Sequence, residues 1–143
     1  MTREAAAGRD EFRTWQRFTT RWADNDAYGH VNNTIFYEWF DSAVNSWLVE
    51  QDMLDIANGN PIALVAETRC SYFEPLAFPQ EVEVGLTAAH VGGSSIRYRI
   101  GVFGIGSKKA AAQGEFLHVV VDRDTRRPVD IPASWRARLK TIS

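Results

Sequence analysis

One stretch of this sequence, residues 34–51, carries apolar side chains in pairs that recur every four positions. An α-helix has about 3.6 residues per turn, so each step of four drifts by about 40° and the apolar arc covers over half the circumference. We therefore predict a long helix that other parts of the chain enclose. The pairs are Ile35/Phe36, Trp39/Phe40, Ala43/Val44 and Trp47/Leu48, and the polar strip between them holds Glu38, Asp41, Ser42 and Asn45.

The rest of the chain offers mainly strands to enclose this helix. Alternating or β-branched and aromatic runs predict strands over residues 12–22, 62–73, from 81 onward, 96–102 and 110–121, with a short helix over 132–139. Glycine and serine at 92–95 and 104–107 predict hairpin turns. Strands joined by hairpins beside one long helix indicate an α+β fold with an antiparallel sheet.

Length and composition limit the classes of protein to consider. With 143 residues, we expect a flexible N-terminal tail over residues 1–10 and a single domain over 11–143. The net charge of -2 lacks the basic surplus of a nucleic-acid binder. No run has the length of a membrane span or the pattern of a secretory signal, and one cysteine cannot form an internal disulfide, so we expect a cytoplasmic protein.

The loop before the predicted helix, residues 23–33, is dense in polar groups. Asn32 or Asn33 can cap the helix by accepting hydrogen bonds from its first free N–H groups. Gly29 supplies a backbone conformation, or a close approach, that a side chain would block. The other polar side chains of this loop are Asp24, Asn25, Asp26, Tyr28 and His30.

This pattern, D-x-D-x-x-G-H-V-N-N followed by an aromatic helix start, resembles the hotdog-fold acyl-CoA thioesterases of the 4-hydroxybenzoyl-CoA thioesterase-like family. The resemblance extends more weakly over about residues 12–138. Its matching residues are Asp24, Asp26, Gly29, His30, Val31, Asn32, Asn33, Phe36 and Tyr37.

The resemblance implies a curved antiparallel sheet wrapped around one long central helix. It also implies a homodimer, able to pair into a homotetramer, with active sites at the subunit interface. In this family the acid that matches Asp26 is the catalytic carboxylate, and a backbone N–H near Asn33 polarises the thioester carbonyl. Some relatives carry a histidine where this chain has Asn33, so a histidine-assisted variant is not implied here.

The chemistry agrees with this assignment. Thioester hydrolysis needs an activated water or a carboxylate nucleophile, together with donors for the developing oxyanion, and a helix N-terminus supplies such donors. We hypothesise that Asp26 is the nucleophile or general base and that the Asn33 N–H is the main oxyanion donor. The alternative is that Asp24 and Asp26 only bond their own loop, as Asx turns do. His30 is either a catalytic contact or a hydrogen bonder of the loop.

Other residues are weaker candidates. Asp24, Asp26 and His30 lack an evident fourth ligand, so we expect no metal, and no organic cofactor is implied. Glu38 is an alternative acid on the helix. CoA phosphates need basic partners, but the sequence does not select them among the seven basic residues of the strands and turns. Candidate substrate-binding residues are Tyr28, Gly29, Ser94, Ser95 and Glu67.

Three functions remain open at this level. The first is hydrolysis of a fatty or aromatic acyl-CoA to the free acid and CoA. The second is a hotdog domain that binds acyl-CoA or acyl-carrier protein without hydrolysing it. The third is a hydratase or dehydratase, which uses an Asp/His pair to move protons on an enoyl chain. The presence of Asp26 favours the first over the second.

Overall fold

Helix α1 (Asn33–Glu50) is the central element of the computed structural model, which describes residues 4–143. Asn32 caps it, since its side-chain oxygen accepts a 3.0 Å hydrogen bond from the Thr34 N–H. The prediction of an enclosed helix is confirmed, and the helix begins and ends one residue earlier than expected. Its buried residues are Phe36, Trp39, Phe40, Ala43, Val44, Trp47 and Leu48.

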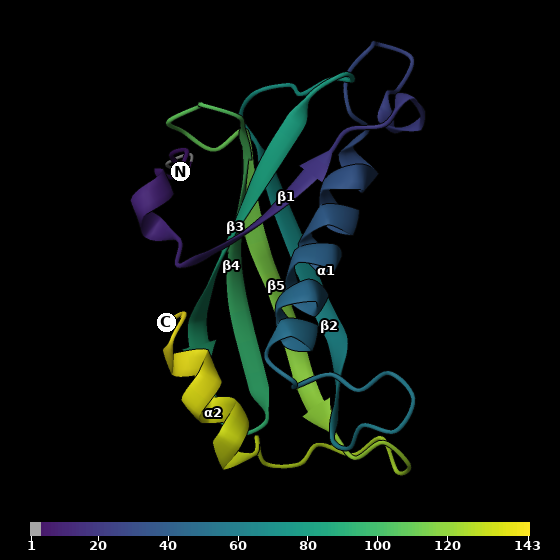
Figure 1. Cartoon of the computed structure of the whole chain (residues 1–143), viewed down its shortest axis with the longest axis vertical. Coiled ribbons are helices and arrows are strands. Elements are labelled where there is room, and N and C mark those ends of the chain that lie inside the picture. Colours follow the sequence, from purple (N-terminus) through teal and green to yellow (C-terminus); the bar gives the residue numbers. More distant parts are fainter. Residues whose placement is uncertain (1–3) are drawn as a thin grey trace.

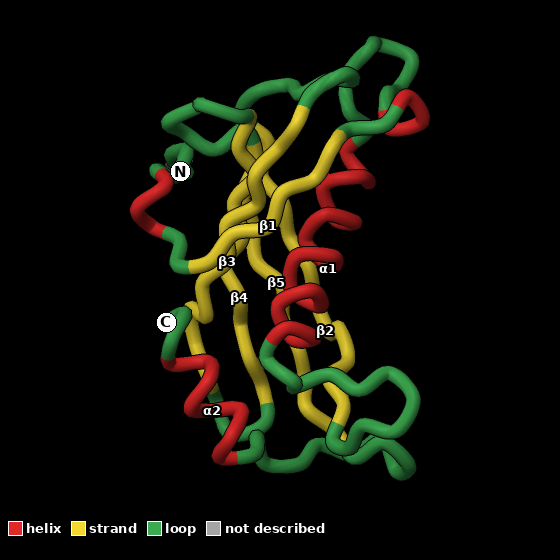
Figure 2. The backbone as a smooth tube through the Cα atoms, viewed as in Figure 1, coloured by secondary structure: helices red, strands yellow, loops and turns green. Residues whose placement is uncertain are grey.

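Five strands form one antiparallel sheet that curves around α1 (Figures 1 and 2). The order across the sheet is β1-β3-β4-β5-β2, so each hairpin joins neighbours, whereas β2 reaches the far edge beside β5. The predicted α+β architecture of an antiparallel sheet around one long helix is confirmed. The strands are β1 (Thr14–Thr19), β2 (Ile62–Tyr72), β3 (Glu81–Val91), β4 (Ser95–Gly104) and β5 (Ala112–Val121).

The first strand is shorter than the predicted residues 12–22 by two residues at its start and three at its end. Thr20 follows the strand, and its N–H and its hydroxyl both donate to the Gln80 carbonyl, each at 2.8 Å. The chain then makes a short 3-10 helix, Trp22–Asp24, which directs it toward the start of α1. The turn after β1 therefore determines where the loop of residues 25–32 lies.

A second, smaller core lies apart from the main core that surrounds α1. It contains Phe12 and Phe103, with Trp15 packed edge-on against both rings at 6.0 and 5.4 Å. The chain before Phe12 belongs to this cluster, because Ala7 is buried and its N–H donates to the Gln113 side chain at 2.6 Å. We call residues 5–12 the N-terminal strap.

The strap includes much of the segment predicted to be a flexible tail, residues 1–10, and that flexibility stays a prediction. The Ala7 N–H donates to the Gln113 side chain, the Ala7 carbonyl accepts the Ala110 N–H, and Arg9 bonds Glu83 at 2.9 Å. The apolar and polar groups of residues 5–10 therefore find partners that composition alone does not reveal. Residues 1–3 lie outside the described residues.

Helix α2 (Ala133–Lys140) closes the opposite end of the sheet from the start of α1 (Figure 1). Leu139 and Ile142 are buried in the main core, and the Ile142 carbonyl accepts hydrogen bonds from the Ala88 N–H and the Thr87 hydroxyl. Among the described residues, no helix has both the length and the apolarity that a membrane crossing requires.

Candidate active site

The loop before α1 folds back on itself as a small hairpin. Asn25 and Val31 form an antiparallel bridge, and the Asp26 N–H donates to the His30 carbonyl at 2.7 Å. Gly29 closes the turn with φ +76°, a conformation that favours glycine, and its N–H donates to the Asp26 carbonyl. The loop therefore holds Asp26 and His30 opposite each other on the two sides of one tight turn.

Asp26 uses one carboxylate oxygen to hold this turn. Its Oδ1 accepts hydrogen bonds from the N–H groups of Tyr28 at 2.8 Å and His30 at 3.3 Å. Among the described residues, Oδ2 has no hydrogen-bond donor. The predicted Asx-type bonding and a role in chemistry are thus compatible, because the loop fixes one oxygen and leaves the other available.

Asn33 is the first residue of α1 and carries a free backbone donor. The next two amides are satisfied at Asn32: the Thr34 N–H donates to its side chain and the Ile35 N–H to its carbonyl, both at 3.0 Å. Within the described chain, the Asn33 N–H donates to no acceptor. An unpaired N–H at a helix N-terminus is a site where developing negative charge is stabilised.

Asp26, His30 and Asn33 line one cavity of about 340 Å³. The structure therefore brings together the three residues that the sequence predicted to be catalytic. The wall beyond them is largely aromatic and comes from α1 and from the chain that leaves β2. The remaining lining residues are Val31, Phe36, Tyr72, Phe73, Glu74 and Pro75.

Tyr72 was not among the predicted site residues, although it fixes the geometry of the helix start. Its hydroxyl donates a 3.0 Å hydrogen bond to the Asn33 carbonyl, and its ring packs edge-on against Phe36 at 5.2 Å. Burial raises the pKa of Tyr72, so its hydroxyl remains a donor at neutral pH. Only the position of β2 beside the helix start could reveal this role, and no local motif records it.

Asp24 stabilises the loop from inside. Its side chain is buried and accepts hydrogen bonds from the Arg21 N–H at 2.8 Å and the Arg21 guanidinium at 2.9 Å. Its carbonyl accepts the Asn32 N–H at 2.8 Å, so it also ties both ends of the loop together. For Asp24, these contacts agree with the alternative in which the acid bonds its own loop.

The other candidates lie outside the cavity. Tyr28 is 85% exposed, and Glu38 points to Arg21 at 3.4 Å. Glu67 lies in the middle of β2 beside a bulge. Ser94 and Ser95 belong to the β3–β4 turn at the other end of the sheet. Within one chain, Tyr28, Gly29, Glu67, Ser94 and Ser95 do not line the cavity that holds Asp26, so their roles in substrate binding stay predictions.

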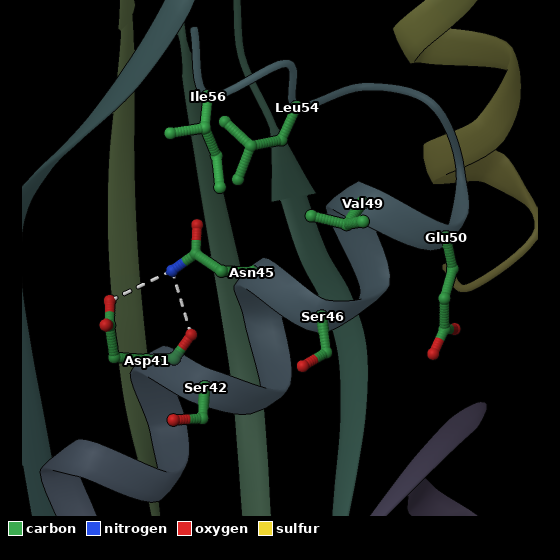
Figure 3. Close-up of a pocket in the computed structure, with 8 residues that line it drawn as sticks. All are labelled: Asp41, Ser42, Asn45, Ser46, Val49, Glu50, Leu54 and Ile56. Carbon is green, nitrogen blue, oxygen red and sulfur yellow. Dashed lines mark hydrogen bonds between the residues drawn. The ribbon is translucent and has the colours of Figure 1, made fainter.

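A different hollow, of about 630 Å³, follows the polar strip of α1 (Figure 3). The carboxylates that line it belong to Asp41 and Glu50. The Asn45 amide donates to the Asp41 carbonyl at 2.9 Å and to the Asp41 Oδ1 at 3.0 Å. Leu54, Ile56 and Val49 form its apolar side. The hollow lies along the middle and end of α1, so it lacks the free helix N-terminus that the first cavity has.

Cys70 is the one thiol of the chain and lies in β2, two residues before Tyr72. Burial raises the pKa of the Cys70 thiol to about 11, which keeps it protonated at neutral pH. A thiolate is the nucleophilic form of cysteine, so Cys70 is a poor nucleophile here.

Comparison with known proteins adds independent information. A family model described as the Thioesterase-like superfamily matches residues 20–139. Among solved structures, the PA5185 protein from Pseudomonas aeruginosa strain PAO1 is 45% identical and superimposes with a TM-score of 0.93 over 97% of each chain. A comparison with curated proteins finds no match.

Two further solved structures are less similar. PA2801 from Pseudomonas aeruginosa, a candidate thioesterase, is 26% identical with a TM-score of 0.83, over 90% of this chain and 98% of its own. Slr0204, a 1,4-dihydroxy-2-naphthoyl-CoA thioesterase from Synechocystis, is 19% identical with a TM-score of 0.79, over 88% of this chain and 94% of its own. At that identity the last likeness supports the fold alone.

Proposed function

The chain belongs to the thioesterase-like superfamily and has the hotdog fold, and we propose that it hydrolyses an acyl-CoA thioester to the free acid and CoA. One observation carries this proposal. A carboxylate oxygen of Asp26 and the N–H of Asn33, each without a partner among the described residues, belong to residues that line the same cavity. A thioesterase needs these two groups: one to attack or activate water, and one to bind the oxyanion.

The proposed reaction begins with the thioester carbonyl oxygen accepting the Asn33 N–H. The positive end of the α1 dipole adds to this donor, so negative charge on that oxygen is stabilised as the carbon becomes tetrahedral. The Tyr72 hydroxyl donates to the carbonyl of the same residue, Asn33. The donor is therefore fixed before the substrate arrives, which avoids reorganisation during the reaction.

Asp26 supplies the other half of the reaction. As a general base it takes a proton from water, the water oxygen bonds to the acyl carbon, and the carbon–sulfur bond breaks to release the CoA thiolate, which then takes up a proton. As a nucleophile it first forms a mixed anhydride, which water then hydrolyses. One turnover in ¹⁸O-water tests for an anhydride that water opens at the aspartyl carbon, because that route labels Asp26 and leaves the released acid unlabelled. The general-base route labels the acid instead.

We also propose that the chain works as a homodimer joined through β2. This strand has eleven residues, pairs on one side with β5, and leaves its other edge uncovered in the described chain. Leu64 and Val65 are 38% and 49% exposed on it. A long, exposed, partly apolar edge strand is a template for pairing with another strand. Pairing of dimers into tetramers is a further possibility that molar mass in solution decides.

The cellular compartment follows from the same proposal. The one cysteine of the sequence, Cys70, has no internal partner for a disulfide. A free, half-buried thiol fits a reducing compartment. We propose that the enzyme acts in the cytoplasm on acyl-CoA.

The proposal is tested by incubating the purified protein with a panel of aliphatic and aromatic acyl-CoAs and a thiol reagent. Thiol release that saturates with substrate is the expected result, and the preferred acyl group identifies the substrate class. Saturable binding of acyl-CoA without thiol release would make the protein a binding domain instead. A change in enoyl absorbance without thiol release would make it a hydratase or dehydratase.

A further inference from the structure

A second cavity, of about 360 Å³, lies between the end of β3 and helix α2. It is lined by three basic side chains, His90, Arg136 and Lys140, and by no acidic side chain. Ser143, the last residue of the sequence, also lines it, so the terminal carboxylate offsets one of the three basic groups. Arg136 and Lys140 are four residues apart on α2 and therefore lie on the same face of the helix. No local sequence pattern connects these residues, because the contact between β3 and α2 is a tertiary one.

The cations of this cavity have no ionic partners. Of the nine contacts between opposite charges in the described part of the chain, none involves Arg136, Lys140 or His90. Arg136 uses one nitrogen to donate to the carbonyls of Gly92 and Gly93, at 2.8 and 3.2 Å. A guanidinium has five N–H donors, so most of its capacity stays available while its position is fixed.

His90 reaches the cavity because of a local irregularity in the sheet. The register of β3 against β4 shifts between Ala88 and His90. Such a bulge changes the direction in which a side chain points, and bulges often occur beside functional sites. His90 is exposed and lines the cavity with Ala88, Ala89 and Val91, which give it an apolar floor.

We propose that this cavity binds a phosphate monoester. Its donors are one anchored guanidinium, one ammonium and one imidazole, a set that complements the charge and the oxygens of a phosphate group. The apolar floor from Ala88, Ala89 and Val91 can contact the organic part of the ligand. The ligand class is therefore a phosphorylated nucleoside or a comparable phosphate ester.

Two sources of such a group are consistent with the chemistry: the 3′-phosphate of CoA and a free phosphate ester. The first rests on the proposed function and on the proposed dimer. Helix α2 and the start of α1 lie at opposite ends of the molecule (Figure 1). An antiparallel pairing of two β2 strands would bring the α2 end of one subunit toward the Asp26 end of the other, so one subunit would bind the CoA whose thioester its partner cleaves.

The test is a calorimetric titration of the wild-type protein with adenosine 3′,5′-bisphosphate and with inorganic phosphate at low salt. We expect saturable binding that weakens as salt rises. Lys140→Gln should lower the affinity about tenfold, and adding His90→Gln should lower it further. Arg138→Gln is the matched control, because Arg138 is a basic residue of the same helix that does not line the cavity. It should bind like the wild type.

A comparison of CoA with dephospho-CoA identifies the source. Tighter binding of CoA, with a difference that disappears in Lys140→Gln, assigns the site to the CoA 3′-phosphate. Equal binding of the two, with adenosine 3′,5′-bisphosphate still saturable, assigns it to a free phosphate ester. No saturable binding of any phosphate compound, or binding that Lys140→Gln and Arg138→Gln change equally, would overturn the proposal. Asp26→Asn should abolish thioester cleavage and leave phosphate binding intact, which separates this site from the proposed activity.

Discussion

The Tyr72 hydroxyl donates a 3.0 Å hydrogen bond to the carbonyl of Asn33, the first residue of α1. This contact joins the end of the edge strand β2 to the helix N-terminus that the proposed reaction uses. Tyr37, the fifth residue of α1, adds to the effect of burial in raising the pKa of Tyr72. The position of the proposed oxyanion donor therefore depends on the edge strand as well as on the helix.

The first prediction concerns this contact. Tyr72→Phe keeps the ring against Phe36 and removes the hydroxyl, so we expect about 1 kcal/mol lower stability. We also expect kcat to fall several-fold with little change in KM, because the first turn of α1 is held less firmly in the transition state. Steady-state kinetics and urea unfolding measure both effects.

Tyr98→Phe is the matched control for that experiment. Tyr98 is fully buried and its hydroxyl has no partner among the described residues, so removing it deletes an unsatisfied polar group. Such a deletion is neutral or stabilising. If Tyr72→Phe and Tyr98→Phe had the same effects on kcat, the role of Tyr72 in positioning Asn33 would be contradicted.

The second prediction concerns assembly. Val65→Lys places a charge on the exposed edge of β2, where Val65 is 49% exposed, and charged edge residues oppose strand pairing. By light scattering, we expect twice the chain mass for the wild type, or four times if dimers pair, and a single chain for the variant. Ile105→Lys is the control, since Ile105 is 48% exposed but lies beyond β4. A variant that keeps the wild-type mass would argue against β2 as the interface.

The third prediction concerns the N-terminal strap. Gly101 lies beneath Phe12, and a Cβ there would lie 2.6 Å from the Phe12 Cζ and 3.0 Å from the Phe103 ring. Gly101→Ala should therefore cost about 1–3 kcal/mol of stability through overpacking. Adding Phe12→Leu should recover part of that loss, because a smaller side chain leaves space for the methyl group. Strictly additive losses in urea unfolding would mean that the two positions do not contact each other.

The fourth prediction concerns acid stability. Burial lowers the pKa of His118 to about 4, whereas an unfolded histidine titrates near 6.5. Between those values the unfolded chain binds a proton that the folded chain does not, so stability falls as pH falls from about 6.5 to about 4. At pH 4.5 this linkage should cost roughly 2–3 kcal/mol relative to pH 7.

His118→Leu provides the comparison, because it removes the titrating ring from a buried position. Hydrogen bonds also lower the pKa values of Glu11 and Asp122. Protonation of these two carboxylates therefore lowers the stability of both proteins in acid. Between pH 7 and 4.5, the variant should therefore lose less stability than the wild type. The difference should equal the contribution of His118. Equal losses in both proteins would show that His118 does not govern this range.

The fold could be predicted largely from one helix. The paired apolar residues of α1 indicate a helix that other elements cover. The predicted hairpins indicate that strands form this cover. The N-terminal strap could not be predicted in the same way. Its anchors are the contact of Phe12 with Gly85 and Gly101 and the hydrogen bond from Ala7 to Gln113. They join residues far apart in the sequence, so no local period predicts them.

The candidate site was predicted in part. Asp26, His30 and Asn33 fall within one short segment, so a local motif could place them together, and the structure brings them to one cavity. Tyr72 could not be found because its contact with Asn33 joins positions 39 residues apart. Glu67 lies in β2, and Ser94 and Ser95 lie at the turn into β4, so within one chain none of the three lines the cavity that holds Asp26.

Asp24 and Asp26 offer the sharpest contrast within the loop, since only Asp26 lines the cavity. Asp24 is buried against Arg21, so Asp24→Asn should lower stability by about 2 kcal/mol while keeping much of the turnover of the protein that remains folded. Asp26→Asn should change stability much less, because the amide oxygen can still accept the Tyr28 and His30 N–H groups.

The central claim is tested most directly by the turnover of Asp26→Asn on the acyl-CoA that the wild type hydrolyses fastest. We predict that kcat falls by at least about 100-fold while the urea midpoint stays near that of the wild type, because the variant loses its base or nucleophile and keeps its loop. Near-normal turnover by a folded Asp26→Asn protein would contradict the assignment of Asp26 as the catalytic carboxylate.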